Sequence, residues 1–288
     1  MNNKLPSCFK QEIIDDEALK TRALLSEFHV NTVCQQARCP NLNHCFKNLR
    51  LAFMILGNTC TRNCRFCAVR KSENVSLGIN DDEPHRISRV VKMLGLKYVV
   101  VTSVTRDDLS DGGAAQFAKT IEAVHNIDKN IKIEVLIPDF KGDISSLKTV
   151  IAAYPEVIAH NIETVRRLYK AVRPQADYRV SLDVLRRIKE IYPSLTVKSS
   201  IILGLGETEE EVVCAMQDLK NTGLDILTLG QYLSPGAQHY PVKEFINNQQ
   251  FKRYKDIGLA LGLKVISSGP LIRSSYQAEE VYKELIYA

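Results

Sequence analysis

The fold is decided by the stretch Leu51-Ala-Phe-Met-Ile-Leu-Gly57-Asn-Thr-Cys60-Thr-Arg-Asn-Cys64-Arg-Phe-Cys67, in which an apolar segment runs directly into three closely spaced cysteines. The apolar segment, Leu51–Gly57, predicts a strand. Three thiolates on one tight loop can ligate three irons of a cubane iron–sulfur cluster and leave the fourth iron open. A structural zinc site is the alternative, but such a site usually takes four ligands and this loop supplies three.

A second group of three cysteines lies just upstream, in Cys34-Gln-Gln-Ala-Arg-Cys39-Pro-Asn-Leu-Asn-His-Cys45. Six of the eight cysteines in the chain therefore lie between residues 34 and 67. Two such groups predict two clusters, with a second structural metal site as the alternative. We assign no role to Cys8 or Cys214, and expect Cys214 to act as a small apolar side chain in a helix.

Length and composition indicate a globular protein of one large domain or two small ones. Of the 288 residues, 45% are apolar and 25% are charged. The net charge of +5 suits an acidic partner or anionic ligand at most, and the chain has no Lys/Arg block of the kind that binds nucleic acid. It starts without a signal-peptide core and has no apolar run near the ~20 residues that span a bilayer. We therefore expect a cytoplasmic protein, in which clustered cysteines indicate metal ligands before disulfides.

Short apolar segments alternate with amphipathic ones along most of the chain. Strands are expected at Leu51–Gly57, Lys97–Val104, Lys132–Ile137, Glu156–His160, Leu195–Leu203, Asp225–Leu229 and Lys264–Ser267. Helices are expected at His85–Leu94, Ala114–His125, Ser145–Ala153, Ile162–Val172, Leu182–Ile191 and Glu209–Asn221. This alternation predicts an α/β fold with a parallel sheet, an incomplete (βα)6-type TIM barrel over residues 47–240 whose active site lies at the carboxyl ends of the strands. Residues 1–46 and 241–288 are expected to be extensions packed against it.

The loop Cys60–Cys67, with Phe66 before its last cysteine, resembles the signature of the radical S-adenosylmethionine (SAM) superfamily. The resemblance implies a barrel of the radical SAM kind and a [4Fe-4S] cluster whose open iron binds the amino and carboxylate groups of SAM. It places Phe66 near the adenine. One electron from the cluster then cleaves SAM to methionine and a 5′-deoxyadenosyl radical, which a barrel interior protects from water and side reactions.

The upstream motif, Cys34–Cys45, is similar to that of lipoyl synthases and of few other families. The similarity runs from about Thr32 to Ala278. It includes Val104–Ala114, Glu134–Gly142, His160–Thr164, Val197–Thr208, Leu227–Leu233 and Gly269–Ala278. It implies insertion of two sulfur atoms at C6 and C8 of a protein-bound octanoyl-lysine, with two SAM molecules consumed and an auxiliary cluster as sulfur donor. The alternatives are another two-cluster radical SAM enzyme and a non-catalytic metal-binding module.

The resemblance also implies a role for the tail segment Arg273-Ser-Ser-Tyr276. A serine of this signature supplies the fourth ligand of the auxiliary cluster; by position we choose Ser275, with Ser274 as the near alternative and Arg273 beside it. A hard, labile oxygen ligand suits a cluster that must come apart. From the residues alone, the serines would instead be expected to cap a helix at Gln277–Tyr287.

Further polar residues and glycines follow predicted strands and are candidates for binding SAM. They are Asn161, Glu163, Lys198, Gly204 and Gly206. Asn161 has an equally weighted alternative role as the cap of the helix expected after it. The two glycines flank a tight turn that would let backbone approach the cofactor.

The implied partners are an octanoylated lipoyl carrier protein or domain, an electron donor such as ferredoxin or flavodoxin, and an iron–sulfur carrier protein, with no nucleic acid and no membrane.

The chain departs from the family at a few positions. It has no tryptophan, and Leu5-Pro-Ser-Cys-Phe9 stands where the family often has an aromatic motif. Ser234–Ala237 and Gln277 also differ. Every expected cluster ligand is unchanged, so the departures affect only the substrate channel and the docking surface.

Overall fold

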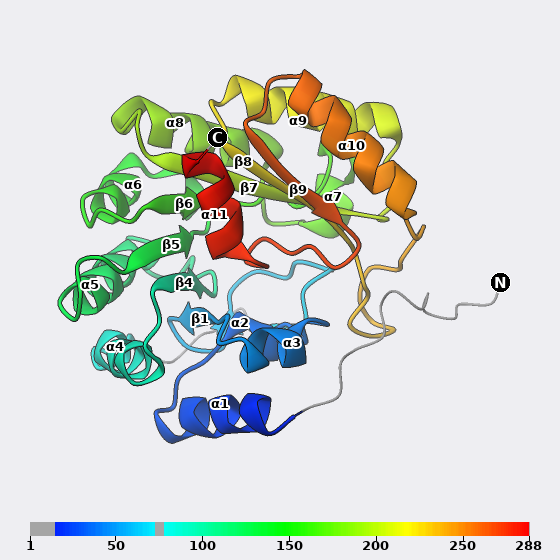
Figure 1. Ribbon diagram of the computed structural model, residues 1–288. Helices are drawn as coiled ribbons and strands as arrows, with labels where there is room; N and C mark the ends of the chain where they lie inside the picture. Colours follow the sequence, from blue (N-terminus) through cyan, green and yellow to red (C-terminus); the bar gives the residue numbers. More distant parts are fainter. Residues whose placement is uncertain (1–14, 73–77, 288) are drawn as a thin grey trace.

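The computed structural model describes residues 15–72 and 78–287 (Figure 1). Within these residues, one parallel sheet has seven strands in the order β1-β4-β5-β6-β7-β8-β9. Their bounds are β1 Ala52–Ile55, β4 Tyr98–Ser103, β5 Lys132–Leu136, β6 Val157–Ala159, β7 Thr196–Leu203, β8 Ile226–Gln231 and β9 Val265–Gly269. Each expected strand segment overlaps one of these strands, so that prediction is confirmed, although β8 and β9 extend two residues beyond the expected ends. Because β1 and β9 are the two edges of the sheet, the barrel is open, as expected.

The strands are largely buried because both faces of the sheet are covered. Val99, Val100 and Val101 of β4 are all buried, although successive side chains point to opposite faces. The seventh strand, β9, lies beyond residue 240, where the C-terminal extension was expected to begin, and still pairs with β8 from Ile226 to Gly230. The sheet therefore includes a strand from that extension.

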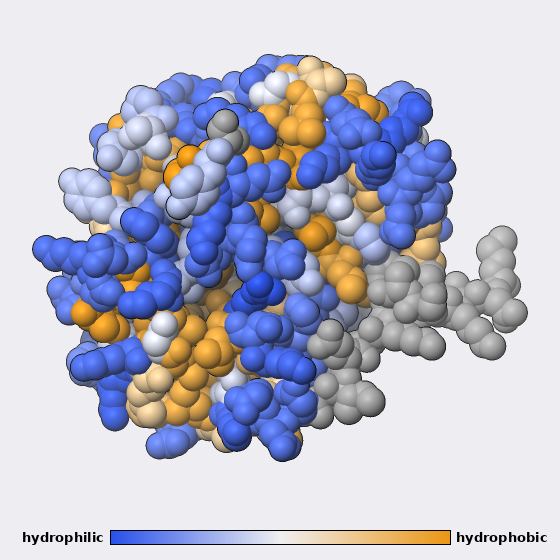
Figure 2. All heavy atoms as spheres, in the orientation of Figure 1, coloured by the Kyte–Doolittle hydropathy of each residue, from blue (hydrophilic) through white to orange (hydrophobic). Residues whose placement is uncertain are grey.

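Helices connect the strands and line the outer face of the sheet, where α4, α5, α6, α8 and α9 follow one another in Figure 1. The helices are α1 Asp16–Glu27, α2 Val33–Gln36, α3 Leu42–Lys47, α4 Glu83–Leu94, α5 Ala114–His125, α6 Ile144–Ile151, α7 Tyr169–Val172, α8 Tyr178–Ile191, α9 Glu209–Asn221, α10 Asn248–Ala260 and α11 Ala278–Ile286. The face in this view is mostly hydrophilic, with apolar side chains gathered between α1 and α4 (Figure 2). None of the described helices is long and apolar enough to cross a membrane.

Several helical segments differ from expectation, and α1, α2 and α3 were not expected at all. Helix α10 was not expected, and its sequence carries Gly258, a residue that disfavours a helix interior. Strand β9 packs close to that glycine, and a Cβ there would lie 2.2 Å from Cδ1 of Ile266, so a larger residue would have to displace that side chain. Cys214 of α9 is exposed, not packed as a small apolar residue. Cys8 and the stretch around it lie outside the described residues.

The helix expected at Ile162–Val172 is wrong in its first half. Glu163 forms a parallel bridge with Ile201 of β7, and its N–H donates to the carbonyl of Ser200 at 2.9 Å. This pairing holds Glu163 at a φ of +65°, outside right-handed helical geometry, so helical structure begins only with a 3₁₀ turn at Arg166–Leu168 that leads into α7.

The segment that carries α2 and α3 meets the C-terminal tail where the sheet is open. Asn41, between α2 and α3, donates a side-chain hydrogen bond of 2.7 Å to the carbonyl of Leu271, just after β9. Arg50 forms an ion pair with Glu280 of α11. The N-terminal helices and the C-terminal tail therefore face each other at the mouth of the barrel, where both carry predicted site residues.

Candidate functional site

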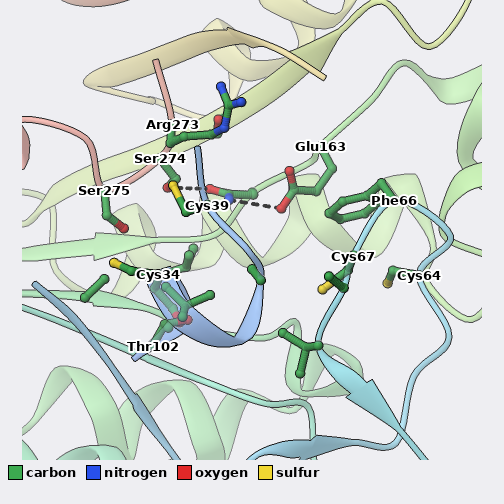
Figure 3. A pocket seen from close by; sticks show the side chains of 18 of the residues that line it. Cys34, Cys39, Cys64, Phe66, Cys67, Thr102, Glu163, Arg273, Ser274 and Ser275 are labelled. Carbon is green, nitrogen blue, oxygen red and sulfur yellow. Dashed lines mark hydrogen bonds between the residues drawn. The ribbon is translucent and has the colours of Figure 1, made fainter. Parts of the chain in front are cut away.

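A cavity of about 620 Å³ lies at the carboxyl ends of the strands, as expected for this architecture (Figure 3). Its lining combines ends of strands, the loop after β1, the N-terminal helices and the C-terminal tail. The predicted site residues that line it are Cys34, Cys39, Cys45, Cys60, Cys64, Cys67, Phe66, Asn161, Glu163, Arg273 and Ser275. The structure therefore brings both cysteine groups and the tail to one space.

The cysteines occupy two parts of this cavity. Figure 3 shows Cys34 and Cys39 beside the tail serines, and Cys64 and Cys67 beside Phe66, with Glu163 between the two parts. This separation matches two clusters better than one shared site, because each cubane needs its own three thiolates. Among the described residues, no three His, Cys, Asp or Glu side chains are close enough to hold a single metal ion.

The loop Cys60–Cys67, which carries the first cysteine group, is held at its start by strand pairing and hydrogen bonds. Cys60 belongs to β2 (Thr59–Cys60), which pairs in parallel with β3 (Arg70–Lys71). The Sγ atom of Cys60 accepts hydrogen bonds from the backbone N–H groups of Arg62 at 3.4 Å and Thr105 at 3.3 Å. Burial raises the pKa of the Cys67 thiol to about 12 and also raises the pKa of Cys64. In the metal-free chain these thiols hold their protons, so iron binding must displace them.

The second group lies on the N-terminal helices. Cys34 in α2 and Cys45 in α3 are buried, and Cys39 lies between the two helices. Burial raises the pKa of Cys34 to about 12. Burial also raises the pKa of Cys39, while the positive charge of Arg273 acts in the opposite direction. Arg273 thus lies where it can stabilise a thiolate, and its Nη1 is anchored on the carbonyl of Ile272 at 2.6 Å.

The two tail serines have different surroundings. The hydroxyl of Ser274 donates to Oδ1 of Asn161 at 3.0 Å, and Nδ2 of Asn161 donates to Oε1 of Glu163 at 3.0 Å. Both serines line the cavity, and in Figure 3 Ser274 lies beside Cys39 and Ser275 beside Cys34. Neither serine caps α11, because its N-cap residue is Gln277, which makes no side-chain capping bond. The alternative of a cap is therefore wrong for both serines, and Asn161 caps no helix either.

Two functional candidates in the wall were missed from sequence. Arg173 is buried, and its Nη1 donates to the carbonyls of Asn161 and Ile162 and to the hydroxyl of Tyr169. It thereby fixes the backbone that leads into Glu163, whose pKa is raised by burial. Nothing in the local sequence of Arg173 marks this role.

His160, at the end of β6, is the second missed candidate. Its Nδ1 lies 2.9 Å from the carbonyl of Ile137, and burial together with the nearby Arg173 lowers its pKa to about 4. The ring is therefore neutral near pH 7, with the proton on Nδ1. Its Nε2 is buried in the cavity wall without a hydrogen-bond partner in the described part of the chain, which leaves one acceptor available to a ligand.

Three expected SAM-binding residues do not line the cavity. Lys198 lies near the amino-terminal end of β7, away from the mouth, and its Nζ forms a fully buried ion pair with Glu134 at 2.8 Å. A Cβ at Gly204 would lie 2.3 Å from Nε2 of Gln231, so this glycine serves the packing of a loop. Gly206, at φ +104°, faces Lys243.

Comparisons with known proteins agree with this arrangement. Residues 54–219 match the radical SAM superfamily. The chain is 49% identical to the lipoyl synthase of Caldanaerobacter subterraneus subsp. tengcongensis, with 97% of each protein covered. It is 51% identical to that of Caldicellulosiruptor bescii, over 91% of this chain and 89% of the relative.

Solved structures share the fold at much lower identity. Methylornithine synthase (PylB) superposes with a TM-score of 0.54 at 15% identity, covering 94% of this chain and 92% of that one. HydG, a maturase of the [FeFe]-hydrogenase, superposes with a TM-score of 0.57 at 16% identity, covering 82% and 62%. The near full-length identity to lipoyl synthases and the match to the superfamily show that the chain belongs to the lipoyl synthase family of radical SAM enzymes.

Proposed function

We propose that the two cysteine groups divide the lipoyl synthase reaction between them. Cys60, Cys64 and Cys67 hold the [4Fe-4S] cluster that binds SAM, and the upstream group holds the auxiliary cluster. As a family member, the chain is a radical SAM sulfurtransferase that uses SAM and two [4Fe-4S] clusters to insert sulfur at C6 and C8 of a protein-bound octanoyl-lysine. The observation that carries the division is a single cavity in which the two groups occupy separate parts.

The chemistry itself requires groups that the side chains do not supply. When bound, the clusters and SAM provide hydrogen-atom abstraction from unactivated C–H bonds and the sulfur for the product. The protein residues bind and orient the substrates and exclude water. Apolar residues that line the cavity, such as Met54, Leu136 and Ile202, offer apolar contacts to an octanoyl chain.

On the SAM side, we assign binding to Phe66, Asn161 and Glu163. Phe66 offers an aromatic face for the adenine. Asn161 and Glu163 are hydrogen-bonded to each other and held by the Arg173 contacts to the backbone, so they present fixed polar groups to the amino-acid or ribose part of SAM. The acceptor at Nε2 of His160 adds a further fixed contact in the same wall.

On the auxiliary side, we assign Ser275 as the fourth ligand beside Cys34, Cys39 and Cys45. The hydroxyl of Ser274 already donates to Asn161, whereas Ser275 lies next to Cys34 in the cavity. Arg273 holds positive charge near Cys39 and so favours the thiolate that iron requires.

The substrate is a lipoyl carrier, and its finer identity is part of the proposal. We propose an octanoylated lipoyl carrier protein or domain, with ferredoxin or flavodoxin as electron donor and an iron–sulfur carrier protein for rebuilding the auxiliary cluster. We propose a cytoplasmic location, without nucleic-acid or membrane partners. The net charge of +5 suits an acidic carrier.

The test is a product assay under anaerobic conditions. The chain is reconstituted with iron and sulfide and given SAM, a reductant and an octanoylated carrier domain. Mass spectrometry should show the lipoylated carrier, with two molecules of 5′-deoxyadenosine formed per lipoyl group; the carrier without the octanoyl group is the control. Formation of 5′-deoxyadenosine with no lipoylated product would contradict the assignment.

A further inference from the structure

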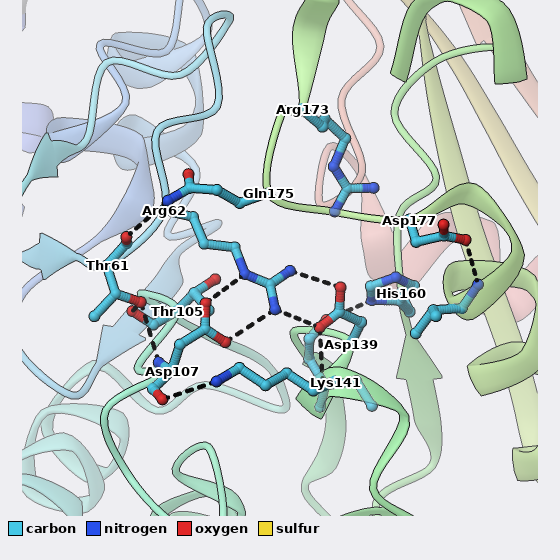
Figure 4. Close-up of polar contacts among 12 residues, drawn as sticks. Thr61, Arg62, Thr105, Asp107, Asp139, Lys141, His160, Arg173, Gln175 and Asp177 are labelled. Atoms are coloured by element: carbon cyan, nitrogen blue, oxygen red, sulfur yellow. Dashed lines mark hydrogen bonds and ion pairs between the residues drawn. The ribbon is translucent and has the colours of Figure 1, made fainter. Parts of the chain in front are cut away.

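Arg62 lies inside the first cysteine loop, between Cys60 and Cys64, yet its side chain is only 5% exposed. Its Nε and Nη2 donate to the two carboxylate oxygens of Asp107 at 2.7 and 2.9 Å. Its Nη1 and Nη2 donate to those of Asp139, both at 2.6 Å (Figure 4). One guanidinium thus bridges two carboxylates with a fork of two bonds to each.

The two carboxylates come from different strands. Asp107 follows β4 and Asp139 follows β5, so Arg62 ties the cysteine loop to the carboxyl ends of two strands. Burial acts to raise the pKa of Asp139, but hydrogen bonds from Arg62 and the charges nearby hold that pKa well below its usual range. Burying charged side chains costs free energy unless each charge is paired. Here Arg62 pairs with the carboxylates of both Asp107 and Asp139.

Backbone bonds join the same two segments. The N–H and hydroxyl of Thr61 both donate to the carbonyl of Thr105 at 3.0 Å, and the N–H of Asp107 donates to the hydroxyl of Thr61 at 3.0 Å. This contact places the N–H groups of Arg62 and Thr105 on the sulfur of Cys60. One of these two donors belongs to the loop and the other to the segment after β4, so their geometry depends on the contact between the segments.

We infer that Arg62 is a positioning residue for the SAM-binding cluster: by fixing the loop on Asp107 and Asp139, it holds two N–H donors on the Cys60 thiolate and raises the reduction potential of the cluster. The inference rests on the proposed role of Cys60 as a ligand. Hydrogen bonds to cluster sulfurs set the potential because they stabilise the extra negative charge of the reduced state. Only arginine can make this contact, since lysine has no planar fork for two carboxylates.

Two variants test the inference from opposite sides of the contact. Arg62→Lys keeps the positive charge and removes the fork. Asp107→Asn leaves the loop sequence intact and weakens one of the two carboxylate contacts. The matched control is Arg167→Lys, because Arg167 also grips a carboxylate with two bonds, to Glu211, but does not line the cavity.

The measurement is the midpoint potential of the cluster whose EPR signal changes when SAM is added, in the reconstituted full-length enzyme. At the midpoint potential of the unchanged protein, we expect the reduced fraction to fall from one half to about one tenth in both variants and to stay unchanged in Arg167→Lys. SAM cleavage should fall more with a weak electron donor than with a strong one.

A second readout needs no metal. In the metal-free chain, the amide hydrogens of Arg62 and Thr105 should exchange faster in both variants than in the control. An unchanged potential in variants that keep the SAM-sensitive signal would overturn the inference alone. If the unchanged protein gave no SAM-sensitive signal, the proposed role of the Cys60 loop would fail first, and the inference with it.

Discussion

The loop at residues 60–67 and the segment at residues 34–45 each carry three cysteines, but they are anchored in different ways. The first lies within the barrel and is braced by the charged contacts of Arg62 to Asp107 and Asp139. The second lies on α2 and α3 and is closed from outside the barrel by the C-terminal tail, through the Asn41 contact to Leu271.

The strengths of these anchors differ as well. A buried hydrogen bond to a charged group contributes about 1.5–3 kcal/mol, whereas one between neutral groups contributes about 0.5–1.5 kcal/mol. The first group is therefore held firmly, which suits a cluster that passes electrons and persists. The second is held by the neutral Asn41 bond and by the ion pair between Arg50 and Glu280, which contributes little because both side chains are partly exposed to water. This weaker hold suits the consumed sulfur-donor cluster that we propose there.

The strongest test of this comparison removes each cysteine group in turn. Replacing Cys60, Cys64 and Cys67 with alanine should abolish 5′-deoxyadenosine formation, because no open iron remains for SAM. Replacing Cys34, Cys39 and Cys45 should abolish lipoylated product while 5′-deoxyadenosine still forms. Each triple variant should lose about half of roughly eight irons per chain. Loss of SAM cleavage in the second variant, with the first cluster intact, would refute the division.

The next test separates the two serines of the tail. Ser275→Ala should lower product formation by at least about tenfold, since even partners outside the ligand shell matter by that factor. It should affect SAM cleavage less. Ser275→Cys supplies a softer, tighter ligand, so iron content should hold while product formation falls. Ser274→Ala is the matched control, and a larger effect there than in Ser275→Ala would assign the ligand to Ser274.

A pH test addresses His160, which lies in the cavity wall. His160 has a pKa of about 4 in the folded chain against 6.5 for an ordinary histidine, so the unfolded state binds the proton more readily. Neutral His160 therefore costs the folded state nothing above pH 6.5. As the pH falls from 6.5 to about 4, the free energy of unfolding should decrease by up to ~3 kcal/mol. Denaturant unfolding of the metal-free chain should show this slope, and His160→Gln should flatten it. Identical slopes in the two proteins would show that His160 is not held neutral.

The smallest expected effect concerns the tail anchor. Asn41→Ala removes the bond to Leu271 and should lower the free energy of unfolding by about 1 kcal/mol. With a chelator present, the auxiliary cluster should lose iron faster while the SAM-binding cluster does not. Asn48→Ala is the control, because Asn48 bonds only locally to the carbonyl of His44 in the same helix. Equal rates of iron loss in the two variants would show that the Asn41 contact with the tail does not stabilise the auxiliary cluster.

The sequence by itself determined the strands, most of the helices and the two cysteine groups. Each of these depends on neighbours along the chain: apolar runs for β4 and β8, a capping box in which Thr208 and Glu211 bond reciprocally at α9, and cysteines a few residues apart on one loop. Local spacing was also enough to predict that the loop Cys60–Cys67 lies at the carboxyl ends of the strands, because it directly follows the first strand.

Only the tertiary structure decided how those groups are held. Arg62 is 77 residues from Asp139, and Asn41 is 230 residues from Leu271. Asp107 and Asp139 directly follow predicted strands, a signal that could have marked them, but not their shared partner. Lys198 was expected at the mouth but lies near the amino-terminal end of β7, where it pairs with Glu134 of β5, and only the structure shows that partner. Contacts between distant segments depend on packing of the whole sheet, and no local pattern encodes them.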